Sequence, residues 1–330
     1  MDASVTEKGA ILLGKHVACD AHDESRAVRV VTHAHSDHMV ELRRSLKECK
    51  MVVATPQTID LLIGLEKLRF EDMQRIKALP YERSMRFEGD NISFYPADHI
   101  LGSAQVLVTD EEQNLKMLYT SDFRLPKTPA IKCDVLVIEA TYGNPSHIRP
   151  FKENIERIFI DLVQEKLKSG PVYIFGYYGK MQEATRILRE SDVNCPAIMP
   201  ERVLKISKIY EKYGVDLGHC ILSPSEESNN IVKSGEPYVG IYHTMSNKHI
   251  GGGATKIFLS GWEFNQPCRR INEESYVVAL SDHSDFNQLI EYVEKSRPEF
   301  VITDDHRAGD AKTLAKEITK KLGIPAKSMP

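Results

Sequence analysis

Residues 33–38 have the sequence His-Ala-His-Ser-Asp-His, which places three imidazoles and one carboxylate within a single short segment. Imidazole nitrogens and carboxylate oxygens are the usual protein ligands of zinc and other borderline divalent ions. Side chains alternate along an extended segment, so His33 and His35 can face one ion while Asp37 and His38 face a second ion nearby. Two ions can share one hydroxide, which is a strong nucleophile at neutral pH. The segment therefore predicts a two-metal hydrolytic site. The alternative, a histidine-rich surface turn, leaves the other ligand candidates of the chain unexplained.

Those other candidates are His99, Asp122 and His306, and each comes after an apolar stretch that is typical of a buried strand. Taken singly, each of them is more typical of a turn or a helix cap. Together with segment 33–38, they supply enough ligands for two zinc ions. Asp20 also follows an apolar run, and it could hold one imidazole in place from behind or form an Asx turn.

Two acid–base candidates lie outside this ligand set. Glu139 ends the apolar run 134–138, and His283 lies between a predicted strand, 276–280, and a predicted helix, 285–296. A leaving alkoxide needs a proton, and a histidine that is oriented by a carboxylate can donate one. His283 also fits the capping segment of the helix that follows it.

The pattern of the chain changes near residue 150. Before it, short apolar runs predict a β-rich region, whereas after it helices and strands alternate, which is typical of a parallel sheet covered by helices. A weaker change occurs near 265–275. The three glycines at 251–253 predict a flexible loop. We therefore expect a first domain segment at 1–149, a second domain at 150–265 and a return to the first domain at 266–330.

Composition limits the class of protein. The chain has 330 residues, of which 42% are hydrophobic and 27% charged, which are ordinary values for a protein with a full core. No apolar run is long enough to span a membrane, the start is too polar for a signal peptide, and the six cysteines are scattered. These features predict a cytoplasmic protein with reduced thiols and no membrane partner. The net charge of −4 argues against a protein that coats nucleic acid by charge alone. It does not exclude a phosphate substrate, because bound divalent ions would be the largest local charges.

At this point the residues resemble a known family, the metallo-β-lactamase-fold nucleases of the β-CASP group. The H-x-H-x-D-H motif of that family matches segment 33–38, and its later motifs match single residues in the same order along the whole chain. The matching residues are His99 before Gly102 and Ser103, Asp122 in Ser-Asp-Phe, Glu139 in Glu-Ala-Thr-Tyr-Gly, His283 in Ser-Asp-His-Ser-Asp, and His306 after the last apolar strand.

The resemblance implies an α/β fold, namely an αββα sandwich of two β-sheets with an inserted α/β β-CASP cap at 150–265 and an active site between them. It also implies two Zn²⁺ ions, with Mn²⁺ or Mg²⁺ as replacements. His33, His35 and His99 would hold one ion, Asp37, His38 and His306 the other, and Asp122 would bridge them. The implied catalytic residues are Asp37, Glu139 and His283, with Asp20 behind the ligands.

Other segments are similar to the small DNA-directed branch, which includes ligase-associated and cross-link-repair exonucleases. Ser260 and Trp262 lie in Phe-Leu-Ser-Gly-Trp, and Lys180 lies in the turn Gly-Tyr-Tyr-Gly-Lys, where amide groups and the lysine could hold a phosphate. These three residues are the candidates for substrate contact. Trp262 could stack a base or fill core space, and the lysine turn is equally typical of a simple strand–helix connection.

The leading hypothesis is a zinc-dependent nuclease, a 5′-to-3′ exonuclease acting on single-stranded or end-exposed DNA in repair or processing. The alternatives are a ribonuclease of the same fold that processes RNA ends and, from another class, a non-catalytic nucleic-acid-binding subunit. Two departures from the family pattern bear on fine metal geometry: Arg307 stands where a glycine is common after His306, and Asp98 replaces a frequent glycine before His99. The sequence leaves the oligomeric state open.

Overall fold

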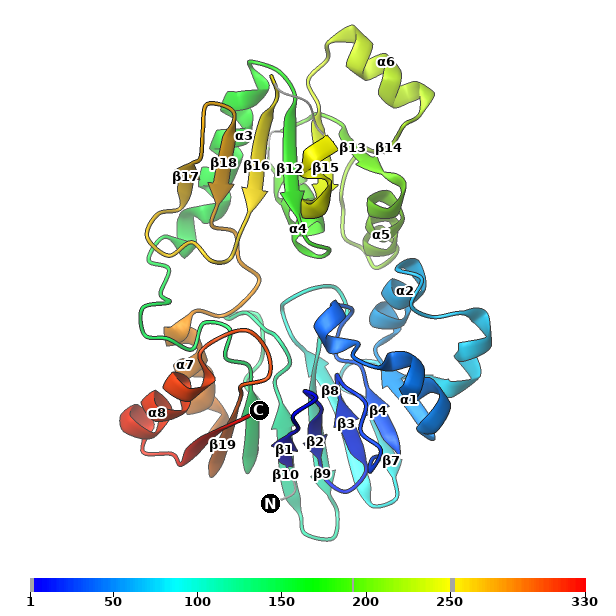
Figure 1. The fold of residues 1–330 in the computed structure, drawn as a ribbon, viewed down its shortest axis with the longest axis vertical. Helices are drawn as coiled ribbons and strands as arrows, with labels where there is room; N and C mark the ends of the chain where they lie inside the picture. Colours follow the sequence, from blue (N-terminus) through cyan, green and yellow to red (C-terminus); the bar gives the residue numbers. More distant parts are fainter. Residues whose placement is uncertain (1–2, 192, 250–252) are drawn as a thin grey trace. The chain divides into compact units, whose positions relative to one another are not determined.

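The computed structural model describes residues 3–191, 193–249 and 253–330. The chain forms two compact units, which are described one at a time (Figure 1). The first unit contains residues Met1–Ile148 and His283–Pro330, and the second contains Arg149–Asp282. Most of the predicted glycine loop, residues 251 and 252, lies outside the described residues.

The first unit is built on two β-sheets. The first sheet has the order β1-β2-β3-β4-β5-β6 and the second has the order β20-β19-β11-β10-β9-β8-β7. The strands of the first sheet are β1 (Ala3–Val5), β2 (Ile11–Leu13), β3 (Val17–Cys19), β4 (Val28–Val30), β5 (Met51–Ala54) and β6 (Ile76–Ala78). Those of the second are β7 (Ser84–Phe87), β8 (Asp90–Pro96), β9 (Ala104–Asp110), β10 (Leu115–Tyr119), β11 (Val135–Ile138), β19 (Phe300–Asp304) and β20 (Ala326–Met329).

Helices cover the outer sides of the two sheets. α1 lies beside β5, and α7 and α8 pack on the second sheet (Figure 1). The helices of this unit are α1 (Leu42–Glu48), α2 (Pro56–Gly64), α7 (Phe286–Ser296) and α8 (Ala311–Leu322), with short 3₁₀ turns η1 (Ser36–His38) and η2 (Phe70–Arg75). The layers are therefore helix, sheet, sheet, helix, as the resemblance to the known family implied.

Alternation along the strands explains why the second sheet is buried on both faces. Met117 and Tyr119 of β10 point into the core between the two sheets, whereas Leu118 packs toward α7 and α8. Val137 and Leu136 of β11 divide in the same way. Because successive side chains of a strand point to opposite faces, an apolar run is what a strand buried on both sides requires.

The second unit contains one seven-stranded sheet in the order β14-β13-β15-β12-β16-β18-β17, parallel except for β17. Its strands are β12 (Val172–Gly176), β13 (Ala197–Pro200), β14 (Cys220–Ser223), β15 (Val239–His243), β16 (Thr255–Leu259), β17 (Cys268–Arg270) and β18 (Ser275–Val278). Its helices are α3 (Ile155–Leu167), α4 (Lys180–Arg189), α5 (Glu201–Lys212) and α6 (Glu226–Ser234), with 3₁₀ turns η3 (Lys152–Asn154) and η4 (Thr244–His249).

The end of this unit differs from the predicted boundary at 265. Residues 266–282 belong to the second unit, because β18 pairs in parallel with β16, with Ile257 opposite Tyr276. The sequence places a turn-rich stretch between these strands, and it cannot show that the next strand returns to the same sheet. The other division, after Ile148, lies one residue from the predicted one.

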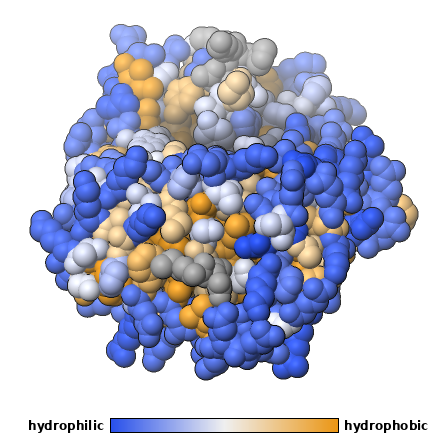
Figure 2. Space-filling model, turned by 60° about the horizontal axis from the view of Figure 1, so that its bottom comes forward, coloured by the Kyte–Doolittle hydropathy of each residue, from blue (hydrophilic) through white to orange (hydrophobic). Residues whose placement is uncertain are grey.

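On the face shown in Figure 2, hydrophilic residues surround a central part in which apolar residues are also visible. Among the described residues, no helix combines the length and the apolar character that crossing a membrane requires.

The core between the two sheets yields a stability prediction. Phe94 of β8 is fully buried there, whereas Phe70 is 96% exposed. We expect Phe94→Ala to lower the free energy of unfolding by about 3–5 kcal/mol, because it removes buried apolar surface and leaves a cavity. Phe70→Ala, the matched control, should change it by less than about 0.5 kcal/mol. Urea unfolding measures both changes, and equal losses would contradict this placement of the core.

Candidate metal centre

The predicted ligands converge because they follow the carboxyl ends of strands that run in the same direction. In the first sheet β3 and β4 are parallel, and they are followed by Asp20 and by the segment 31–38. In the second sheet β10, β11 and β19 are parallel, and Asp122 and Glu139 follow the first two of these strands. Turns after parallel neighbours meet at one edge of a sheet, so the side chains that they carry are brought together.

Three imidazoles and one carboxylate form a compact group. His33 Nε2 lies 3.2 Å from His35 Nδ1, which lies 3.0 Å from His99 Nε2. Asp122 Oδ2 lies 3.7 Å from the Nε2 atoms of both His33 and His99. One ligand atom from each of the four residues lies within 4.8 Å of all the others. We call this group, His33, His35, His99 and Asp122, the histidine cluster.

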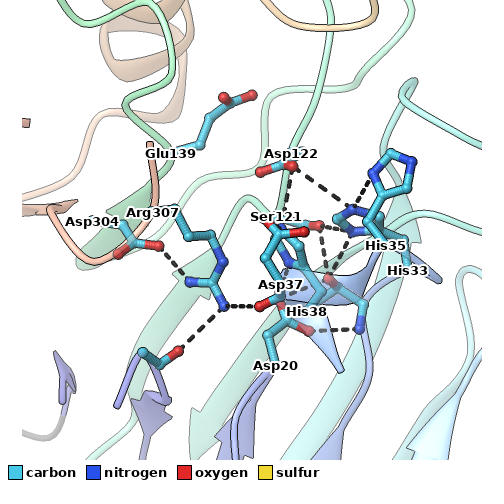
Figure 3. A network of polar contacts seen from close by, with 12 residues as sticks. Asp20, His33, His35, Asp37, His38, Ser121, Asp122, Glu139, Asp304 and Arg307 are labelled. Atoms are coloured by element: carbon cyan, nitrogen blue, oxygen red, sulfur yellow. Dashed lines mark hydrogen bonds and ion pairs between the residues drawn. The ribbon is translucent and has the colours of Figure 1, made fainter. Parts of the chain in front are cut away.

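The second pair of predicted ligands lies on the other side of Asp122. His38 Nε2 is 3.2 Å from Asp122 Oδ2 and 3.4 Å from Asp37 Oδ2 (Figure 3). Asp122 therefore faces both the histidine cluster and the Asp37–His38 pair. The short 3₁₀ turn η1 carries both members of this pair.

Buried hydrogen bonds orient the ligand rings from behind. Asp20 Oδ2 lies 2.7 Å from His38 Nδ1, and the same carboxylate accepts from the N–H and the hydroxyl of Thr32. His33 Nδ1 lies 3.2 Å from the hydroxyl of Ser121. Because the Nδ1 atoms of His38 and His33 are engaged in this way, their Nε2 atoms point toward Asp122. Asp20 thus has the location predicted for a residue behind the ligands.

Charge in the centre is shared between a carboxylate and an imidazole. Burial opposes charge on both groups, but their attraction outweighs it: the pKa of Asp122 is well below its usual value, and that of His38 is well above. Burial, together with the neighbouring histidines, holds the pKa of His33 well below its ordinary value. Metal ligands must be deprotonated, so cation binding here would release a proton from His38.

The donor set fits divalent cations. Imidazole nitrogens that share a tetrahedral zinc at about 2.0–2.1 Å lie roughly 3.3 Å apart, close to the separations of 3.2 and 3.0 Å found here. In addition, His38 Nε2 is buried and forms no well-aligned hydrogen bond, and its polar neighbours are the carboxylates of Asp122 at 3.2 Å and Asp37 at 3.4 Å. A neutral imidazole nitrogen beside two carboxylates is a donor set that suits a divalent cation.

The predicted acid–base pair is also present. His283 Nδ1 lies 3.0 Å from Glu139 Oε2, and Glu139 Oε1 accepts from the N–H of Phe123. The imidazole of His283 lies 4.7 Å from that of His99, measured between ring centres, which places it beside the histidine cluster. Glu139 is buried and His283 is partly exposed. The arrangement matches a histidine oriented by a carboxylate.

His306 is the one predicted ligand that the structure does not bring to the others. Its imidazole lies over Gly9, where an added Cβ would be 2.1 Å from His306 Cδ2. Arg307, the next residue, instead reaches the centre: it donates to the carbonyl of Asp37 and to the carboxylate of Asp304 (Figure 3). In the sequence, Arg307 stands out only as a departure from a family pattern, and no feature singles out Arg29, which donates to the carbonyl of His38.

The three predicted substrate contacts all belong to the second unit. Lys180, at the start of α4, is buried, with its Nζ 3.1 Å from Asp282 Oδ1. Ser260 and Trp262 follow β16, and the Ser260 hydroxyl accepts from the N–H of Trp262. Trp262 is 52% exposed, so it does not fill the core of this unit.

Comparisons with known proteins place this centre among related chains. An uncharacterized protein in the lig 3′ region of Acidianus ambivalens is 37% identical over 139 residues, 42% of this chain and 99% of that protein. A probable DNA ligase of Opitutus terrae is 25% identical over 305 residues, 86% of this chain but only 27% of the ligase. An RNase J-like protein of Methanocaldococcus jannaschii is 27% identical over 394 aligned positions, covering 97% of this chain and 92% of the relative.

Structural comparison supports the fold alone. A crystal structure of a protein of unknown function from Enterococcus faecalis V583 superposes with a TM-score of 0.64 at 13% identity, covering 94% of this chain and 81% of the other. No family model matches the chain.

The contact between Asp20 and His38 yields a prediction for metal affinity. We expect Asp20→Asn to weaken zinc binding about 10- to 100-fold, because the charge that orients His38 is lost. Asparagine tolerates the left-handed backbone of this position, where φ is 64°. The control is Asp23→Asn, at a partly exposed position nearby whose carboxylate accepts a hydrogen bond from the N–H of Ser25. Competition with a chromophoric chelator measures both affinities, and equal values for the two variants would show that Asp20 does not support a ligand.

Proposed function

This chain belongs to the β-CASP group of metallo-β-lactamase-fold proteins, and on that premise we propose that it is a zinc-dependent nuclease that hydrolyses phosphodiesters of nucleic acid. The observation that carries the proposal is the location of Asp122 between the histidine cluster and the Asp37–His38 pair, next to Glu139 and His283. In this proposal His33, His35 and His99 would hold one ion, Asp37 and His38 would hold another, and Asp122 would be available to both. Bound ions would supply a hydroxide nucleophile and offset charge on the phosphoryl group.

The residues of the chain divide the remaining work. Asp20, Thr32 and Ser121 hold the ligand rings in one orientation, so no reorganisation is needed when the substrate arrives. Glu139 orients His283 through Nδ1. His283 would donate a proton to the leaving oxygen. Lys180, Ser260 and Trp262 contact the nucleic acid strand.

We further propose that the substrate is DNA, attacked stepwise from a 5′ end. Two relatives support this choice: one is named a probable DNA ligase, and another is named for its place in the lig 3′ region. A ribonuclease that processes RNA ends is the second candidate, since the RNase J-like relative aligns over nearly its whole length. The third hypothesis, a non-catalytic binding subunit, gives no reason for the Glu139–His283 pair to lie beside a full ligand set.

Matched substrates separate the three hypotheses. End-labelled single strands of DNA and RNA with one sequence, with and without a 5′ phosphate, are incubated with zinc-loaded protein and with His35→Ala as the inactive control. We expect DNA to be shortened stepwise from a 5′-phosphorylated end. Cleavage of RNA while DNA persists would favour the ribonuclease. Binding without cleavage of either strand by zinc-loaded protein would contradict the nuclease and favour the binding subunit.

The role of His283 is tested by separating turnover from metal content. We expect His283→Ala to lower kcat about 10²- to 10⁴-fold, the usual contribution of a positioned general acid. Its zinc content should equal that of the wild type, because His283 is not among the proposed ligands. His219→Ala, at an exposed histidine of the second unit, is the matched control and should leave kcat unchanged. A wild-type kcat for His283→Ala would exclude this residue as the proton donor.

A further inference from the structure

Two arginines, Arg29, which is fully buried, and Arg307, whose side chain is 8% exposed, hold the backbone of the turn that carries Asp37 and His38. Arg307 Nη2 donates to the carbonyl of Asp37 at 3.3 Å, and Arg29 Nη2 donates to the carbonyl of His38 at 3.2 Å. The two carbonyls are consecutive along the chain. With both of them bound, the peptide backbone between the two side chains cannot rotate freely, so the direction of both side chains is restricted.

Arg307 is itself anchored at two further points. Its Nη1 donates to Asp304 Oδ2 at 2.6 Å, and its Nη2 also donates to the carbonyl of Gly9 at 3.2 Å. One side chain therefore joins the end of β19, the turn between β1 and β2, and the turn that carries Asp37 (Figure 3). The guanidinium group is planar and presents several donors in a fixed geometry, which suits it to join three acceptors.

Core packing alone does not explain why these arginines are buried. Arg29 is completely buried, and its Nε and Nη1 atoms have no hydrogen-bond partner among the described residues. Arg307 Nε is also buried without a hydrogen-bond partner among the described residues. Charged groups with unbonded donors are costly to bury, and an apolar side chain of similar size would avoid that cost. A role in holding the turn accounts for both of them.

His306 is directed away from the same turn. Asp304 Oδ1 accepts from the N–H of His306 at 3.0 Å, while its other oxygen accepts from Arg307. The imidazole then lies over Gly9, whose φ is 79°. A Cβ at this position would lie 2.1 Å from His306 Cδ2, so only a glycine lets the imidazole come this close. No contact between His306 and Asp37, His38 or Asp122 occurs within the described part of the chain. Asp304 and Gly9 thus favour an arrangement in which Arg307, and not His306, reaches the centre.

We propose that Arg307, backed by Arg29, is the positioning residue for the ligands of the second ion, and that His306 is not a ligand. The inference rests on the proposed function, because that function requires the second ion. The protein ligands of this ion are then Asp37, His38 and Asp122. Three protein ligands leave coordination open for water and substrate, which is the usual condition of a catalytic zinc as opposed to a structural one.

Metal stoichiometry tests the inference without any turnover. Zinc per chain is measured by mass spectrometry of the elements after equilibration with buffered free zinc, for the wild type, His306→Ala, Arg307→Met and Asp37→Asn. We expect two ions for the wild type and for His306→Ala. Arg307→Met should bind the second ion about tenfold or more weakly, the usual effect of losing a residue that orients ligands, while the first ion is retained. Asp37→Asn is the reference variant, which shows how far zinc per chain falls when a ligand of the second ion is lost.

Two results would overturn the inference. Loss of one ion by His306→Ala would make His306 a ligand, and unchanged affinity for both ions in Arg307→Met would remove the positioning role. If circular dichroism shows that Arg307→Met does not fold, Arg307→Lys replaces it. This variant keeps the charge but cannot reach three acceptors, so weaker binding of the second ion is again expected, and wild-type affinity again overturns the role.

A measurement on the wild type is independent of any variant. Diethyl pyrocarbonate modifies solvent-accessible histidines that are not bound to metal, and peptide mass spectrometry identifies each modified residue. We expect zinc to protect His35, which is partly exposed, and to leave the reaction rate of the exposed His306 unchanged; protection of His306 by zinc would overturn the inference. A chain that binds two ions in this way but cleaves no nucleic acid would count against the proposed function and leave the inference standing.

Discussion

The carboxylate of Asp122 has imidazoles on both of its sides, and this placement constrains the rest of the first unit. Its Oδ2 atom lies 3.2 Å from His38 Nε2 and 3.7 Å from the Nε2 atoms of His33 and His99. A buried carboxylate is stable only where opposite charge and hydrogen bonds compensate for its loss of water. In the protein by itself, His38 supplies that charge, as its raised pKa and the lowered pKa of Asp122 indicate. A divalent cation can supply it instead.

Such a centre needs a rigid surrounding, which the two-sheet sandwich provides. The ligands lie on short turns directly after strands, and those strands are held by neighbours on each side and by apolar packing on each face. Side-chain hydrogen bonds then fix the orientation of the ligand rings and of the turn backbone, which the strands alone do not determine. Asp20 holds His38, Ser121 contacts His33, and Arg29 and Arg307 bind the carbonyls between the two sheets. The polar groups beneath the centre thus form one connected network, in which the loss of one member leaves others unpaired.

The overall charge of the chain and the local charge of the centre have different effects on the binding of an anion. A net charge of −4 does little to attract a polyanion. Attraction for a phosphodiester must therefore come from bound cations and from individual residues. Arg29 and Arg307 lie near the negative charge of Asp20, which opposes the lowering of their pKa by burial. They leave the carboxylates Asp37 and Asp122 as the groups that face an incoming cation.

The amino-acid sequence alone determined the types of the ligand residues and their order along the chain, since apolar runs mark the strands and each polar candidate directly follows one. The four-layer fold followed from the resemblance of these motifs to a known family. Because turns after parallel strands meet at one edge, it could also be predicted that His33, His35, His99 and Asp122 lie together. The tertiary structure alone decided between His306 and its neighbour Arg307. That choice depends on the contacts of Arg307 with Asp37 and Gly9, which are 270 and 298 positions away, and no local pattern records such contacts. The buried Arg29 escaped prediction for the same reason: Val28 and Val30 pack in the core between the sheets, so Arg29 lies on the opposite face of the strand, where a solvent-facing residue is expected, and only the tertiary fold encloses it there.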